Sequence, residues 1–139
     1  MDDDVSEMIE RVFRAYNEGG PTAFIDVMTK ADALSPDFVM EIQDDLPNGG
    51  EWAGAEGFAE MARLWLEAWK SFEVQPGEPA RVGDDRYLVP VRQRAVARGS
   101  GIALDEPFVY ALTFDDGRLS RVGLFKDRDL AERSLSSGG

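Results

Sequence analysis

The sequence contains neither cysteine nor histidine. Without cysteine the chain can form no disulfide, no thiolate nucleophile and no cysteine-ligated metal site. Without histidine it lacks the commonest general base, the Ser-His-Asp triad and most zinc or non-haem iron sites. Any acid–base chemistry must therefore use Asp, Glu, Tyr or Lys, and we expect no metal and no cofactor.

Basic residues and long apolar runs are also scarce. The chain has 15 Lys and Arg against 27 Asp and Glu, a net charge of −12, which disfavours a nucleic-acid partner. No stretch approaches the roughly 18 apolar residues of a membrane span. The N-terminal MDDDVSE lacks the basic start and apolar run of a signal peptide. We therefore expect a cytoplasmic protein that neither binds nucleic acid nor spans a membrane.

The length of 139 residues suits one domain with a single hydrophobic core. We see no internal repeat and no linker, so the domain is expected to cover residues 1–139. The ends of the chain, residues 1–4 and the Ser-Ser-Gly-Gly tail at 136–139, are expected to be flexible.

Helical periodicity dominates the first half of the chain. Apolar residues at the i, i+3, i+4, i+7 spacing predict a helix over residues 5–16, and Gly19-Gly20-Pro21 provides a stop signal. A second, short helix is predicted over 22–28. A third, with a broad apolar stripe, is predicted from Gly54 to Phe72.

The pattern changes to strands in the second half. One strand is predicted over 38–43, followed by a loop over 44–50. Antiparallel strands are predicted over 87–91, 108–114 and 119–125, and a last short helix over 127–135. This order indicates an α+β fold, in which a curved antiparallel sheet packs on three helices from the N-terminal half. A curved sheet folded over helices forms a cone. Its interior is apolar and open at one end, which suits a small-molecule pocket.

Four segments carry a resemblance to a known family: LPNGGEWAG (46–54), RQRAVARGSGIALDE (92–106), FDDGRLSRV (114–122) and FKDRDLAERSL (125–135). With them the chain resembles, over residues 5–135, the nuclear-transport-factor-2-like superfamily and its SnoaL-like proteins of the polyketide cyclase type. The resemblance implies the cone fold and a homodimer through the exposed sheet face. It does not imply one activity, because this scaffold serves isomerases, cyclases, dehydratases and binding domains.

Neither catalytic pattern of the superfamily is complete in this sequence. The resemblance to its ketosteroid isomerases implies a tyrosine at Val12, with Tyr16 one turn further on, and a base at Ile42, next to Glu41. The isomerases' later acid falls near Tyr110. The SnoaL cyclases use an aspartate for which Asp127 is the nearest match, together with histidines that are absent here.

Three residues are therefore candidates for catalysis. Asp127 could act as a base at the pocket mouth, or it could instead cap the last helix. Glu41 is the second candidate base. Tyr110 shares a strand face with apolar residues, so its hydroxyl could stabilise an oxyanion or its ring could simply pack in the core.

Five further residues are candidates for ligand binding: Tyr16, Trp65, Trp69, Arg92 and Phe108. The two tryptophans lie at i, i+4, a spacing typical of core packing, and one of them could line the cavity. Arg92 and Arg94 share a strand face. They would hold a ligand if that face is concave, and would contact solvent or a second subunit if it is convex.

Two main functions remain open from the sequence. The first is cofactor-independent proton transfer on a small hydrophobic molecule, of the isomerase or cyclase type, which needs a carboxylate inside the pocket. The second is binding of such a molecule without chemistry, which needs the pocket alone. A third alternative is a protein-interaction domain whose cavity is filled by its own side chains.

Overall fold

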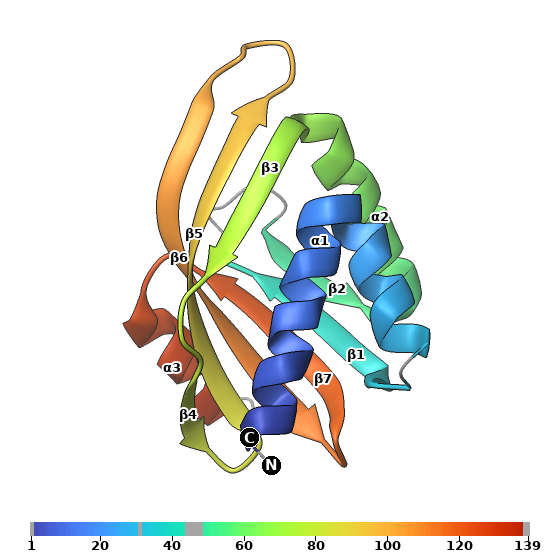
Figure 1. Cartoon of the computed structure of the whole chain (residues 1–139), viewed down its shortest axis with the longest axis vertical. Coiled ribbons are helices and arrows are strands. Elements are labelled where there is room, and N and C mark those ends of the chain that lie inside the picture. The colour runs from blue at the N-terminus through green and yellow to red at the C-terminus, as the bar shows by residue number, and fades with distance from the viewer. Residues whose placement is uncertain (1, 31, 44–48, 138–139) are drawn as a thin grey trace.

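The computed structural model describes residues 2–30, 32–43 and 49–137, so most of the predicted 44–50 loop lies outside them. Its helices are α1 (Asp2–Lys30), α2 (Gly54–Ala68) and α3 (Arg128–Ser137). Its strands are β1 (Leu34–Ile42), β2 (Gly50–Ala53), β3 (Trp69–Pro76), β4 (Ala80–Gly83), β5 (Arg86–Ala97), β6 (Ala103–Asp115) and β7 (Arg118–Phe125) (Figure 1). Flexibility of the chain ends stays a prediction.

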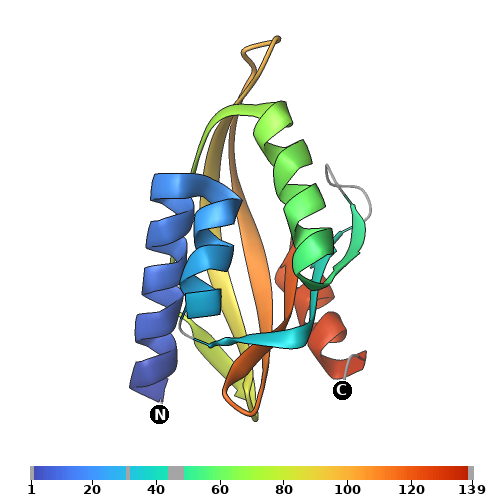
Figure 2. The same ribbon diagram turned by 90° about the vertical axis from the view of Figure 1, so that its right-hand side faces the viewer.

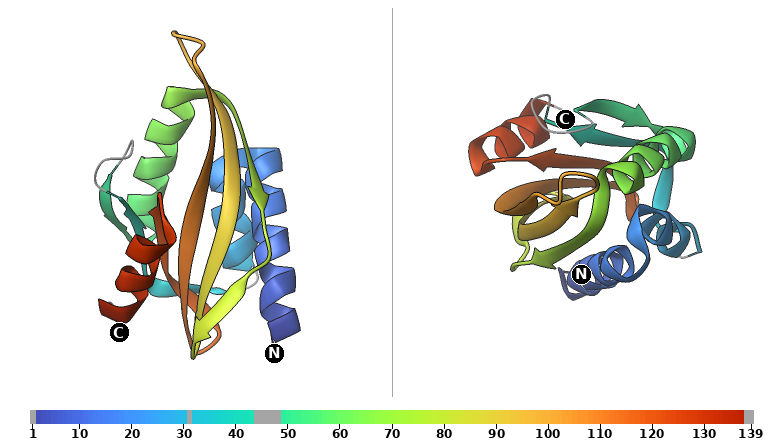
Figure 3. Two further views of the ribbon diagram at one scale, coloured as in Figure 1. Left: turned by 90° about the vertical axis from the view of Figure 1, so that its left-hand side faces the viewer. Right: turned by 90° about the horizontal axis from the view of Figure 1, so that it is seen from above.

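The sheet is curved and mixed. Its strand order is β2-β1-β7-β6-β5-β3, and β4 also pairs with β5. The predicted antiparallel strands of the second half are β5, β6 and β7, whereas β1 runs parallel to β7. Helices α1 and α2 cover the concave face, and α3 packs on the outer face against Leu88, Ala111 and Phe125 (Figure 3). The concave side therefore holds the main core.

The third predicted helix ends earlier than its apolar stripe suggested. α2 stops at Ala68, and Trp69 and Phe72 belong to β3 instead. The prediction of helix to Phe72 is wrong because residues from Trp69 onward pair with β5, with Phe72 opposite Ala95. Pairing with β5 stabilises an extended conformation in this stretch, where the apolar spacing alone favours a helix.

Helix α1 consists of two segments that meet at Gly20. The backbone there has φ 79° and ψ −169°, a conformation open almost only to glycine. The second segment returns beside the first (Figure 2). A Cβ on Gly20 would meet Phe72 at 3.5 Å and Leu66 at 3.6 Å, which is ordinary contact. Glycine is therefore required by the backbone conformation and not by lack of space.

We expect Gly20→Ala to lower the free energy of unfolding by about 1–3 kcal/mol, the usual cost of such a backbone conformation. Urea denaturation measures it. Glu18→Ala, an exposed change two residues earlier, is the control and should stay within about 0.5 kcal/mol of the parent chain. Equal stability of all three proteins would contradict the assigned conformation.

The side chain of Asn17 joins α1 to the edge of the sheet. Its Nδ2 donates to the backbone oxygen of Val74 at 2.7 Å, and the backbone nitrogen of Val74 donates to its Oδ1 at 2.7 Å. The amide thus pairs with both backbone groups of one residue of β3, as a neighbouring strand would. Because an unpaired edge is open to other chains, this contact also protects β3.

We expect Asn17→Ala to expose the amide of Val74 and raise its rate of hydrogen exchange at least tenfold, since its acceptor is gone. The amide of Gln75 points to the opposite edge, toward β5, and serves as an internal control. Unchanged exchange at Val74, or the same acceleration at both amides, would show that Asn17 does not hold this edge.

Candidate functional site

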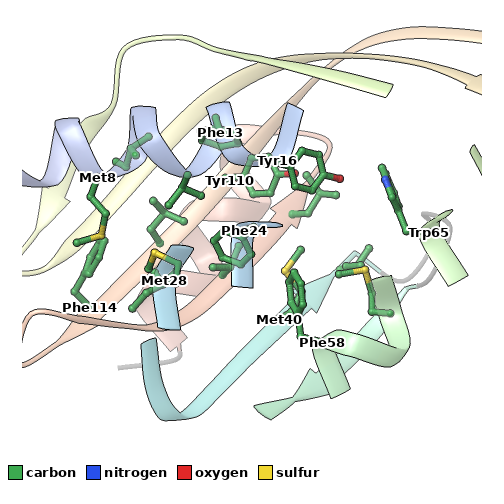
Figure 4. A pocket seen from close by; sticks show the side chains of 18 residues that line it. Met8, Phe13, Tyr16, Phe24, Met28, Met40, Phe58, Trp65, Tyr110 and Phe114 are labelled. Atoms are coloured by element: carbon green, nitrogen blue, oxygen red, sulfur yellow. The ribbon is translucent and has the colours of Figure 1, made fainter. Parts of the chain in front are cut away.

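A cavity of about 60 Å³ lies between the concave face of the sheet and the helices (Figure 4). Its lining comes from α1, α2, β1, β6 and β7, and is apolar or aromatic throughout. None of the described residues that line it carries a charge. The lining consists of Met8, Ile9, Val12, Phe13, Tyr16, Phe24, Met28, Met40, Ile42, Phe58, Met61, Trp65, Tyr110, Leu112, Phe114, Leu119, Val122 and Leu124.

Helical and strand periodicity together explain this wall. The apolar face of α1 turns toward the sheet, so residues three and four apart reach the same cavity. Alternate residues of a strand share a face, so Met40 and Ile42 point inward and Glu41 between them does not. On β6, Tyr110 and Leu112 follow the same rule.

Four methionines contribute to this lining: Met8, Met28, Met40 and Met61. The sequence contains only one other, Met1. A dry cavity of about 150 Å³ admits benzene, so a ring-sized ligand requires this smaller cavity to widen. Methionine is unbranched and has three rotatable bonds, which lets it move aside at little cost. The wall is therefore suited to adapt to its contents.

The cavity adjoins a second hollow of about 230 Å³ at the surface. Three side chains, Met8, Val12 and Met28, line both spaces. The outer hollow also includes the charged residues Glu7, Arg11 and Asp32. These three side chains therefore lie between the apolar interior and the polar hollow at the surface.

Two hydroxyl groups and one indole nitrogen are the polar side-chain atoms of the lining. Burial raises the pKa of the Tyr110 hydroxyl above its ordinary value. The pKa of the Tyr16 hydroxyl is raised mainly by burial and, to a smaller extent, by the nearby Tyr110. Both tyrosines are therefore neutral at physiological pH and can donate hydrogen bonds. The Nε1 of Trp65 is buried and has no hydrogen-bond partner among the described residues.

We expect the free energy of unfolding to decline above about pH 10, where tyrosines of the unfolded chain ionise. The folded state keeps both protons because its pKa values are raised, so this stabilisation is complete below that pH and is lost as the pH rises. Urea denaturation between pH 9 and 11 measures the decline. The Tyr16→Phe, Tyr110→Phe double variant should show a shallower slope. Parallel slopes would contradict the assigned environment.

The structure brings together three of the residues that the sequence suggested, namely Tyr16, Trp65 and Tyr110. Phe108 is buried in the same core but does not line the cavity. The Trp69 ring packs against the Trp65 ring, with centroids 5.7 Å apart, and is not part of the lining. Of the two tryptophans, only Trp65 therefore faces the cavity.

Glu41 lies on the outer face of the sheet. Its carboxylate binds Arg121 Nη2 at 2.8 Å and accepts a hydrogen bond from Ser134 Oγ at 3.1 Å. Arg121 Nη2 also contacts Glu51 at 2.9 Å. This cluster joins β1, β2 and β7 to α3, which is a structural role. The position of Glu41 does not support the role of a base in the cavity.

Asp127 caps helix α3. Its Oδ1 accepts a hydrogen bond from the backbone nitrogen of Leu130 at 2.9 Å, the usual arrangement of an N-terminal cap. The side chain is exposed and absent from the cavity lining. Of the two alternatives for Asp127, the geometry matches the cap.

Arg92 is on the outer face as well, opposite the cavity. It is exposed, and its Nε contacts Asp105 Oδ1 at 2.6 Å; Arg94 approaches the same carboxylate at 3.7 Å. Between the two arginines, Gln93 points inward and is buried. The arginines thus lie on the convex side, and we leave Arg92 out of the proposed site. The homodimer through this face stays a prediction.

The family model described as SnoaL-like domain matches residues 9–122. The chain belongs to this family. The match covers α1 from its third turn through most of β7, which includes every residue of the cavity lining except Met8 and Leu124. The matched segment of this chain therefore contains nearly the whole cavity lining.

Several solved structures share the fold. TerC, co-crystallised with polyporic acid, has a TM-score of 0.72 at 19% identity over 94% of this chain and 96% of its own. An NTF2-like protein of unknown function from Burkholderia pseudomallei K96243 has a TM-score of 0.72 at 20% identity, covering 93% of each chain.

A third structure, from Catenulispora acidiphila DSM 44928, has a ketosteroid isomerase-like fold and is a complex with trimethylamine. Its TM-score is 0.69 at 13% identity, over 86% of this chain and 84% of its own. A search among curated proteins found no match.

Two classes of feature are missing from the described residues. No group of acidic side chains in residues 2–30, 32–43 and 49–137 is arranged to hold a metal ion. None of the helices in these ranges is long and apolar enough to cross a membrane.

Proposed function

We propose that the protein binds a small, uncharged and mainly apolar molecule in the cavity between α1, α2 and the sheet. The observation that carries the proposal is the lining itself, in which described residues from five elements present apolar atoms, two neutral hydroxyls, one indole and no charge. Burial of an unpaired charge among such atoms is strongly unfavourable. The site therefore favours neutral ligands over ions.

The same lining favours binding over proton transfer. Abstraction of a carbon-bound proton needs a base within about 3 Å of it. Glu41 faces Arg121 on the outer side of the sheet, and Asp127 caps α3. Tyr16 and Tyr110 have raised pKa values, which makes them donors and not bases at neutral pH. A ligand-binding role without carboxylate catalysis thus agrees best with the geometry.

The neighbouring structures support a small organic ligand in general terms. TerC was co-crystallised with polyporic acid, and the Catenulispora protein is a complex with trimethylamine. At 19% and 13% identity these proteins share the fold with this chain, so their ligands are not assigned to it. They support the choice of compact organic probes in a first experiment.

Three one-ring probes of similar size test the proposal: ethylbenzene, acetophenone and benzoate. The protein is labelled with [methyl-¹³C]methionine, which places labels on Met8, Met28, Met40 and Met61 of the wall. We expect the two neutral probes to shift these methyl signals at pH 7. Benzoate should bind at least tenfold more weakly, because its carboxylate finds no partner in the lining.

A matched pair of variants locates the binding. Val12→Phe adds a ring to the cavity wall and should abolish the shifts, whereas Val82→Phe makes the same change at an exposed position and should preserve them. Asp127→Asn should also preserve them. The proposal fails if no probe moves the methyl signals, or if benzoate binds as tightly as ethylbenzene.

A further inference from the structure

The indole N–H of Trp65 is a hydrogen-bond donor that the described part of the chain leaves unpaired. The Trp65 side chain belongs to the cavity lining, the residue is 6% exposed, and its Nε1 has no described partner. Such a buried donor destabilises the empty protein, and any acceptor that reaches it restores the lost interaction.

Trp65 differs in this respect from the other polar groups of the site. An indole nitrogen only donates, whereas the hydroxyls of Tyr16 and Tyr110 donate or accept. The tyrosines can therefore adapt to a donor or an acceptor on a ligand, but Trp65 is satisfied only by an acceptor. Trp69 Nε1 is also buried and unpaired among the described residues, but Trp69 does not line the cavity. Among the described residues of the lining, Trp65 is therefore the one with a buried and unpaired N–H.

We propose that Trp65 is the polar anchor of the site and that the cavity takes neutral cyclic carbonyl compounds, with the carbonyl oxygen accepting a hydrogen bond from Nε1. The carbonyl supplies the missing acceptor without a charge. The methionines Met8, Met28, Met40 and Met61 then pack against the apolar ring, and their flexibility sets the range of rings that fit. This inference rests on the proposed function and names its ligand class.

The experiment compares acetophenone with ethylbenzene, which have similar shapes but differ in the carbonyl oxygen. The dissociation constants of both are measured by methionine methyl titration in the parent protein, in Trp65→Phe and in Trp69→Phe. The quantity compared among the three proteins is the ratio of the dissociation constants of ethylbenzene and acetophenone. The cost of taking the carbonyl out of water is common to all three proteins and cancels between them.

We expect Trp65→Phe to reduce the preference for acetophenone about tenfold relative to the parent protein, the loss of one neutral hydrogen bond. Trp69→Phe, which removes an unpaired N–H outside the lining, should leave the ratio within about twofold. A ratio that stays within twofold in Trp65→Phe would overturn the proposal, as would an equal decrease in both variants.

A second measurement needs no variant at the site. The chain has three tryptophans, and their indole N–H signals can be observed in the ¹⁵N-labelled parent protein. Acetophenone should move the Trp65 signal downfield, and ethylbenzene should not. Binding of both probes with no such difference would overturn the Trp65 contact but leave the proposed function intact. Binding of neither probe would instead contradict the proposed function.

Discussion

The position of α1 over the cavity depends on one contact, in which the side-chain amide of Asn17 pairs with Val74 of the edge strand β3. Asn17 fixes α1 to β3 through both backbone groups of Val74. Once α1 is fixed there, the Phe13 ring packs edge-on against Tyr110, with ring centroids 5.3 Å apart. The Tyr16 ring packs at a tilt against Phe72, with centroids 5.1 Å apart. The break at Gly20 then returns the second segment of α1 over the same face. The helices therefore cover the sheet without filling the space beneath them.

Much of the fold could be predicted from the sequence because its signals are local. Helical spacing located both segments of α1 and the start of α2, and strand-like runs located β7 and the central parts of β5 and β6. Both of the latter strands extend beyond the predicted 87–91 and 108–114, to Arg86–Ala97 and Ala103–Asp115. The edge elements were missed. β2 and β4 have four residues each, too few to show alternation, and β3 continues the apolar spacing of α2 through Trp69 and Phe72. Only pairing with β5 decides that this stretch is extended.

The sequence does not show which face of each strand points into the cavity. Alternation shows that Glu41 and Met40 point to opposite sides, but not which side is concave; the same holds for Arg92 and Gln93. Tyr110 was correctly placed among apolar neighbours. The methionine wall was not foreseen, because its four members come from α1, β1 and α2 and converge only in the folded protein.

The methionine wall also has a chemical consequence. Oxidation by peroxide converts a thioether into a sulfoxide, which is polar and chiral. Met28 is 1% exposed, Met61 4% and Met40 6%, so the folded protein shields these three sulfur atoms while Met8 lies nearer the surface. A sulfoxide at any of them would place a strong dipole in an apolar wall. Burial therefore protects the methionines of the lining, and any opening of the cavity would expose their thioethers to peroxide.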